Sequence, residues 1–186
     1  MAQSIPTVTP TAAPSLGIAQ STLEGVFTVT PPRPFEDARG PLAGVYKRLP
    51  YQELGINHEF IQDKVSVSGI YVLRGLRGDA QSWKLVSCLY GRSYLVVVNW
   101  DQDSDQRGVW ESFVISDQNR TQVLIPPKFA VGTLALSDQA LTLEKRSAVQ
   151  SREDEFDIFW NDPSLDIWWP VASPTMSQEN QSLSKD

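Results

Sequence analysis

The chain has 186 residues, with 16 Lys and Arg, 22 Asp and Glu, and a net charge of −6. This length predicts one folded domain. The acidic balance excludes the basic face that a nucleic-acid-binding protein or a protein docked on an anionic membrane needs. The single cysteine, Cys88, excludes an intrachain disulfide framework, and the single histidine, His58, excludes a histidine-rich metal centre. No apolar run approaches the roughly 20 residues that cross a bilayer.

Both ends of the chain have the composition of segments that do not fold. Residues 1–20 are rich in Pro, Thr, Ala and Ser, and they contain neither Lys nor Arg. Such a segment buries too little apolar surface to offset its ordering entropy, and it lacks the charged and apolar regions of a secretion signal. Residues 173–186 are polar as well. We therefore expect a disordered arm at 1–20, a folded domain at 21–172 and a polar tail at 173–186.

Between these ends the sequence has the pattern of strands. Strands are expected at residues 24–30, 59–68, 69–73, 83–90, 93–100, 109–115, 121–125, 130–136 and 140–144. Gly91 and Arg92 separate two of them and predict a two-residue hairpin turn. Residues 49–54 favour a single helical turn. Short strands that recur about every 8–12 residues indicate an all-β sandwich or jelly roll.

Six motifs occur in the order of one known family. They are FEDARG at 35–40, FIQD at 60–63, VLRGL at 72–76, KLV at 84–86, IPPKFA at 125–130 and WNDPSLDIWWP at 160–170. They resemble the F-x-D-x-R-G, F-V-Q-D, V-L-R-G-L, K-L-V, I-P-x-G-F-A and W-N-D-P-x-L-x-I-x-W-P segments of the dTDP-4-dehydrorhamnose 3,5-epimerases, the RmlC-like cupins. The resemblance spans residues 35–180, most of the expected domain.

The resemblance implies a fold, an assembly and a ligand. The fold is a double-stranded β-helix jelly roll with short peripheral helical turns. The assembly is a homodimer that exchanges an N-terminal strand, and the location is cytoplasmic. The ligand is a nucleotide-linked 4-keto sugar bound in the barrel mouth, with no cofactor and no metal. We also expect Trp160, Trp168 and Trp169 to pack under the barrel, His58 to lie outside the site, and Cys88 to be a buried small hydrophobe.

Epimerisation beside a ketone needs a base that removes a C–H proton and an acid that returns one to the opposite face. Histidine suits the base because it titrates near neutral pH. The resemblance places this base at Arg77, which stays protonated and cannot act as one. It places the Asp that orients the base at Asn180, the acidic Tyr at Val149 or Gln150, and a second His at Val131. All four positions have changed, so we expect the usual activity to be weak or absent.

Two alternatives remain open. The chain is a non-catalytic nucleotide-sugar-binding subunit, or one that pairs with an active paralogue. Alternatively, it is an epimerase with a substitute carboxylate base, Asp79 or Glu144, because desolvation in an apolar barrel raises the pKa of a carboxyl group. The plainer interpretations are that Asp79 is a turn residue and that Glu144 is an outward-facing charge on a strand.

The positions expected to bind substrate have changed less than the catalytic ones. By resemblance, Arg74, Gln62, Lys84 and Arg39 lie near the diphosphate or the sugar. Arginine suits bidentate contacts to phosphate, and lysine makes contacts as a point charge. Arg77 adds a further positive charge that favours an anionic ligand.

Overall fold

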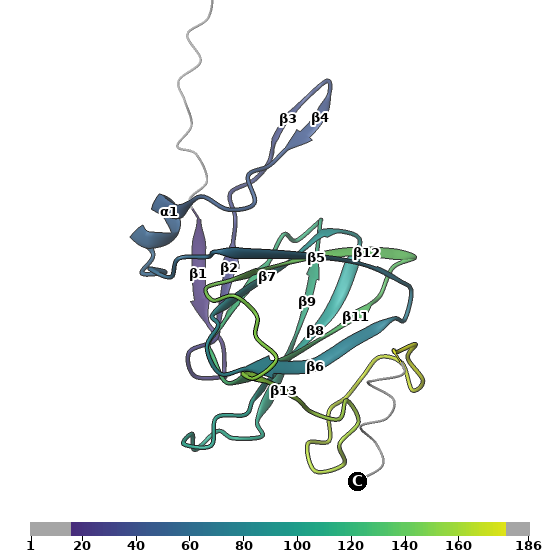
Figure 1. Ribbon diagram of the computed structural model, residues 1–186. Helices are drawn as coiled ribbons and strands as arrows, with labels where there is room; N and C mark the ends of the chain where they lie inside the picture. The colour runs from purple at the N-terminus through teal and green to yellow at the C-terminus, as the bar shows by residue number, and fades with distance from the viewer. Residues whose placement is uncertain (1–15, 178–186) are drawn as a thin grey trace, which may run out of the picture.

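The computed structural model describes residues 16–177, which form two facing antiparallel sheets (Figure 1). The six-stranded sheet has the order β1 (Gly17–Gln20), β2 (Phe27–Thr30), β10 (Gln122–Ile125), β7 (Lys84–Tyr90), β12 (Gln139–Arg146), β5 (Gln62–Gly69). The five-stranded sheet has the order β13 (Glu155–Asp157), β6 (Leu73–Asp79), β11 (Phe129–Ala135), β8 (Arg92–Asn99), β9 (Trp110–Ser116). The expected all-β jelly roll is confirmed.

The chain passes repeatedly from one sheet to the other. Because β7 and β8 belong to different sheets, the hairpin predicted at Gly91 and Arg92 is wrong. The backbone does reverse there, since Gly91 has a φ of 73° and its N–H donates to Oδ2 of Asp117 at 3.1 Å. A glycine turn pattern marks the reversal, but it does not say in which sheet the next strand will pair.

Two further boundaries differ from expectation. The strand predicted at 69–73 is interrupted by a turn at residues 70 and 71, and the next strand, β6, covers Leu73–Asp79. Gly75 and Gly78 lower the strand propensity of β6, but its pairing with β11 outweighs this effect. Residues 17–20 of the predicted arm form β1, whose exposed side chains give no apolar signal. The expected helical turn is confirmed as α1 (Arg48–Glu53).

The apolar run in β8 is buried on both faces. Leu95 and Val97 pack between the sheets, whereas Val96 and Val98 pack on the outer face of the five-stranded sheet. Residues 158–176 cover that outer face. A strand covered on both sides has a continuous apolar sequence rather than an alternating one, which explains the unbroken run.

The C-terminal segment confirms part of the tryptophan prediction. Trp160 and Trp169 pack in the outer cluster, but Trp168 is 63% exposed and forms a T-shaped ring pair with Tyr94. The predicted tail also begins later than expected, because Thr175 forms a β-bridge with Val72. The rest of that tail, from residue 178, and residues 1–15 of the predicted arm lie outside the described residues.

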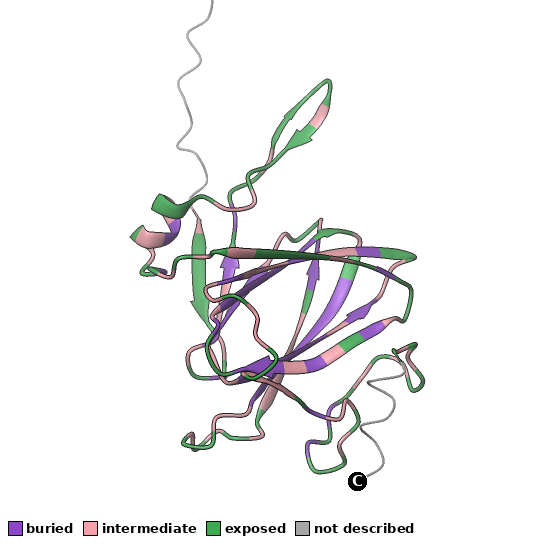
Figure 2. Ribbon diagram, in the orientation of Figure 1, coloured by how far each residue is buried: buried purple, intermediate pink, exposed green. Residues whose placement is uncertain are grey.

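Two elements lie outside the barrel (Figure 1). Helix α1 packs Tyr51 against the outer face of the six-stranded sheet. The hairpin of β3 (Phe35–Asp37) and β4 (Gly40–Leu42) projects away from the sheets and is almost entirely exposed (Figure 2). Within residues 16–177, no helix is long and apolar enough to cross a membrane.

The crossing at Gly91 can be tested by adding a methyl group. A Cβ there would lie 2.1 Å from the carbonyl oxygen of Gln139, whereas one at Gly55, whose φ is also positive, would meet nothing within 4 Å. We expect Gly91→Ala to lower the free energy of unfolding by roughly 2–4 kcal/mol and Gly55→Ala by about 1–2 kcal/mol. Urea denaturation followed by circular dichroism measures both, and equal losses would contradict the close approach.

Candidate functional site

A cavity of about 650 Å³ lies between the two sheets, lined by side chains of β5, β6, β7, β11 and β12 and by residues near the start of the tail. This volume is within the range of small-molecule sites. Its charged lining residues are five cations and two carboxylates: Lys64, Arg74, Arg77, Lys84, Arg146, Asp79 and Glu144. The cavity therefore has an excess of three positive side chains in a chain whose net charge is −6.

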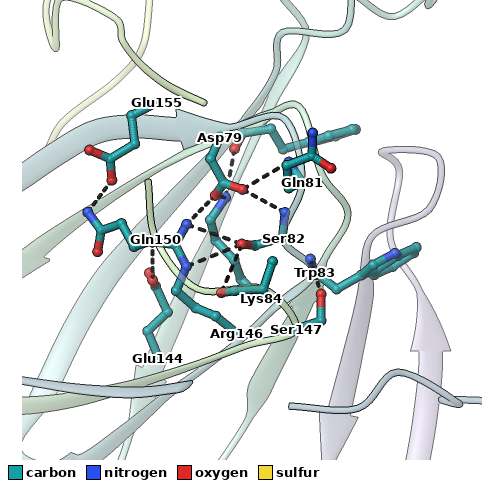
Figure 3. Close-up of polar contacts among 12 residues, drawn as sticks. Asp79, Gln81, Ser82, Trp83, Lys84, Glu144, Arg146, Ser147, Gln150 and Glu155 are labelled. Atoms are coloured by element: carbon teal, nitrogen blue, oxygen red, sulfur yellow. Dashed lines mark hydrogen bonds and ion pairs between the residues drawn. The ribbon is translucent and has the colours of Figure 1, made fainter. Parts of the chain in front are cut away.

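A buried ion cluster, drawn in Figure 3, belongs to the lining of this cavity and is called its inner wall below. Oδ2 of Asp79 accepts hydrogen bonds from Nζ of Lys84 at 2.9 Å and from Nη2 of Arg146 at 2.6 Å. Oδ1 accepts from the backbone N–H groups of Ser82 at 2.6 Å and Gln81 at 3.1 Å. None of the three charged side chains is more than 4% exposed. One carboxylate thus takes donors on both of its oxygens.

The strand register explains why these charges meet. Arg146 on β12 lies directly opposite Lys84 on β7, where two like charges repel each other. Asp79 comes from β6 in the other sheet and contacts both cations. The carboxylate therefore relieves the repulsion and also links the two sheets.

The pKa values of the cluster follow from burial and pairing. Burial raises the pKa of Asp79, but Lys84, the Ser82 N–H and Arg146 together bring that pKa below its usual value. Burial lowers the pKa of Lys84, and Asp79 only partly opposes this. Asp79 is both a turn acceptor, as expected, and a buried ion-pair partner. A carboxylate so well supplied with donors is a weak base.

Glu144 lies in the same cavity and has fewer partners. Its Oε1 lies 3.5 Å from Nη1 of Arg146 and is buried without a hydrogen-bond donor. The plainer interpretation of Glu144 as an outward-facing charge is wrong, because alternation along β12 turns Thr142, Glu144 and Arg146 toward the cavity. This carboxylate is more available for chemistry than that of Asp79.

Two cations at the exposed rim contact only neutral groups. Arg74 donates through Nε to Oγ of Ser68 at 2.9 Å and through Nη2 to the carbonyl of Val67 at 3.1 Å. Lys64 donates to Oε1 of Gln150 at 2.5 Å. Within residues 16–177 neither forms an ion pair with a carboxylate. Their charges are therefore uncompensated by this part of the chain.

Two of the four changed catalytic positions meet in the cavity. Arg77 on β6 lies directly opposite Val131 on β11, and both line the cavity. Nε of Arg77 lies 2.7 Å from Oδ1 of Asp157, and Nη2 lies 3.1 Å from Oδ2. Arg77 is thus a paired cation where the resemblance places a neutral base.

Other predicted residues lie outside the cavity lining. Oε1 of Gln62 accepts the N–H of Gln150 at 3.0 Å, Gln150 donates to Glu155, and the Val149 side chain is exposed. Arg39 lies on the projecting hairpin, 2.6 Å from Asp37. Asn180 lies outside the described residues. His58 is stacked on Trp83 with ring centroids 3.9 Å apart, and burial lowers its pKa.

Sequence reasoning missed Arg146, Lys64 and Asp157. Arg146 had a detectable signal, because it is two residues from Glu144 and so shares its face of a strand. Lys64 and Asp157 had none that separates them from ordinary surface charges. Cys88 is buried on β7, as predicted. Among residues 16–177, no group of three or more His, Cys, Asp and Glu side chains is placed to hold a metal ion.

Two antiparallel sheets around a polar, cation-rich cavity define a cupin-type jelly roll that is suited to anionic small molecules. The family model of dTDP-4-dehydrorhamnose 3,5-epimerase matches residues 20–185. The chain belongs to this family.

Individual relatives agree with this assignment. The chain is 34% identical to the dTDP-4-dehydrorhamnose 3,5-epimerase of Methanothermobacter thermautotrophicus, over 82% of this chain and 83% of the relative. It is 34% identical to the enzyme of Escherichia coli K12, over 85% of this chain and 87% of the relative. Its structure matches the Bacillus anthracis enzyme with a TM-score of 0.84 and 29% identity, over 90% and 97%. It matches the Legionella pneumophila enzyme with a TM-score of 0.84 and 32% identity, over 90% of each chain.

The ion cluster predicts a large effect on stability. Asp79→Asn leaves two buried cations without a counter-charge, and we expect it to lower the free energy of unfolding by about 3–5 kcal/mol. Asp157→Asn breaks the partly exposed pair with Arg77 and should lower the free energy of unfolding by about 0–1 kcal/mol. Urea unfolding at pH 7 measures both.

The same measurement against pH tests the charge. The pKa of Asp79 is lower in the folded state than its unfolded value near ~3.9, so its stabilisation is present above about pH 4. That stabilisation is lost as the pH falls through the folded-state pKa. Asp79→Asn should remove this acid dependence, and a variant as acid-sensitive as the natural chain would contradict the assignment.

Proposed function

We propose that this chain binds a nucleotide-linked sugar in the cavity and that its C3/C5 epimerisation of an NDP-4-keto sugar is weak or absent. The observation that carries the proposal is a cation-rich cavity in which the paired Arg77 occupies the position of the family's base. Because relatives of this chain act on nucleotide-linked sugars, we assign it to nucleotide-sugar metabolism.

Charge supports the ligand class. A sugar nucleotide carries a diphosphate, and Arg74 and Lys64 at the rim have no carboxylate partner among the described residues. Arginine and lysine side chains are the usual phosphate contacts in proteins. The related Bacillus anthracis structure holds TDP and pyrophosphate, and the Legionella pneumophila structure holds dTDP-4-keto-L-rhamnose. A thymidine diphosphate sugar is therefore the first ligand to test.

The lining supports the loss of proton transfer. No His or Tyr of the described residues lines the cavity. Asp79 is held as a carboxylate by Lys84 and Arg146, so it lacks the raised pKa of an effective general base. By resemblance, Val131 and Asn180 also replace proton-transferring groups of the family, and this supports the proposal that its usual chemistry is weak or absent here.

Glu144 supports a second candidate, an epimerase with a substitute base. Its carboxylate lines the cavity and has one buried oxygen without a hydrogen-bond donor. Of the two carboxylates proposed from the sequence, Glu144 is therefore the better one.

The assembly is also a proposal. The projecting hairpin is almost entirely exposed (Figure 2) and includes Phe35, Arg39 and Leu42. None of these three residues lines the cavity of its own chain. A homodimer, or a pair with an active paralogue in the cytoplasm, would cover these side chains and give Arg39 a ligand to contact.

The catalytic part of the proposal is tested by solvent exchange. We expect deuterium uptake from D2O into dTDP-4-keto-6-deoxyglucose at a rate at least about 100-fold below that of the Escherichia coli enzyme assayed in parallel, because general acid–base catalysis contributes about 10²–10⁴-fold. Mass spectrometry of the recovered sugar nucleotide measures it. Exchange at a normal enzymatic rate overturns the proposal. In that case Glu144→Gln and Asp79→Asn in the same assay decide which carboxylate acts.

The binding part is tested by a matched pair of arginine variants. Arg74→Gln should weaken binding of dTDP about tenfold, because one charge-assisted contact is lost. Arg48→Gln, on α1 and outside the cavity, should leave binding unchanged. Isothermal titration calorimetry at two salt concentrations measures both. Equal affinities for the two variants would argue against the rim as the phosphate site.

A further inference from the structure

Glu144 has the one buried side-chain oxygen or nitrogen that lacks a hydrogen-bond partner among residues 16–177. That atom is Oε1, and the side chain that carries it lines the cavity. Buried polar atoms are almost always hydrogen-bonded, because an unsatisfied atom loses its contact with water and gains nothing in return. An oxygen left in this state beside a cavity of about 650 Å³ is suited to a group that a ligand brings.

Lys64 is the donor that the strand register offers to Glu144. The two residues lie directly opposite each other on β5 and β12, and both line the cavity. Side chains so placed are close enough to form an ion pair, but Nζ of Lys64 instead donates to Oε1 of Gln150 at 2.5 Å. Gln150 is itself held, because its backbone N–H donates to Oε1 of Gln62 at 3.0 Å and its side-chain amide donates to Glu155. Gln150 therefore keeps the ammonium group of Lys64 away from Glu144.

The other neighbours of Glu144 do not supply a donor either. Val86, opposite Glu144 on β7, has no polar side-chain atom. Arg146 lies two residues further along β12, but its guanidinium group donates to Asp79 and Ser82 at 2.6–3.4 Å. Its Nη1 comes within 3.5 Å of Oε1 without forming a hydrogen bond. The strands beside Glu144 therefore leave this acceptor available to the cavity.

The chemistry of a carboxylate decides which sugar suits this position. An ionised carboxylate only accepts hydrogen bonds, and so does the oxygen of a ketone, whereas a hydroxyl group can donate one. A ketone at this place would set two acceptors against each other, and a hydroxyl group would satisfy the buried oxygen. A site built around such a hydrogen bond discriminates strongly against an analogue that lacks the donor.

We propose that Glu144 is a specificity-determining residue that selects a nucleotide-linked sugar with a hydroxyl group over the corresponding 4-keto sugar. Gln150 is a positioning residue that keeps Lys64 from pairing with Glu144. The inference rests on the proposed nucleotide-sugar binding and names the class of sugar. It also fits weak epimerisation, because an alcohol has no carbonyl group to acidify the neighbouring C–H bond.

Two sugar nucleotides that differ only at C4 test the selection. Here dTDP-6-deoxyglucose has a hydroxyl group, and dTDP-4-keto-6-deoxyglucose has a carbonyl group. By isothermal titration calorimetry we expect the natural chain to bind the alcohol at least about tenfold more tightly. Glu144→Gln should bring the two affinities within about threefold, because a carboxamide both donates and accepts. Equal affinities in the natural chain, or a preference that survives Glu144→Gln, would overturn the inference.

A control variant and a third ligand complete this experiment. Glu59→Gln makes the same chemical change on the surface, outside the cavity lining, and should keep the preference for the alcohol. A natural chain that binds dTDP and both sugar nucleotides equally well contradicts only the selection at Glu144. A natural chain that binds none of the three ligands contradicts the proposed function itself.

A double variant tests the role of Gln150. Gln150→Leu removes the acceptor from Lys64, so the ammonium group should turn to Glu144 and the preference for the alcohol should fall below about threefold. Gln150→Leu combined with Lys64→Met removes the ammonium group as well and should restore the preference. Because the ratio of two affinities is compared, a general loss of binding does not imitate this pattern. An undiminished preference in Gln150→Leu, or no recovery in the double variant, would refute the positioning role.

Discussion

The buried carboxylate of Asp79 links the two sheets of this jelly roll beside the cavity. Asp79 reaches from the five-stranded sheet to Lys84 and Arg146, which the register of the six-stranded sheet places opposite each other. Without a negative charge between them, these cations could not share a dry interior. The same contacts hold Asp79 ionised and supplied with donors, so the group that stabilises the site is unsuited to removing protons from a substrate.

Different side chains line two regions of the cavity. At its rim, Arg74 and Lys64 have no carboxylate partner among residues 16–177, and positive charge at an opening attracts a phosphorylated ligand. On its inner wall, Asp79 and Glu144 match Lys84 and Arg146. Arg77 and Val131 also line the cavity, at positions where the family resemblance leads us to expect proton-transferring groups. Ligand binding and proton transfer therefore depend on different side chains, and each can be tested separately.

Family membership and activity rest on different parts of the sequence. Several of the shared motifs include core positions, such as Leu73 and Leu76 in β6, which are 1% exposed and pack against the C-terminal segment. Packing at such positions maintains the fold, whereas function depends on the few polar groups placed on it. Arg77 directly follows Leu76 on the same strand, so a core position and a cavity-lining position are neighbours in the sequence.

The sequence alone determined the fold class and most strands. The apolar run of β8, the buried Cys88 and the motifs were sufficient, because burial and strand periodicity are local properties. The sequence did not determine that Gly91 begins a crossing between sheets, or that Glu144 faces inward beside Arg146. Only the tertiary structure decided that Asp79, Lys84 and Arg146 meet, because their contact depends on the register of β12 with β7 and on how closely the opposite sheet approaches. Neither is encoded in any single segment of the chain.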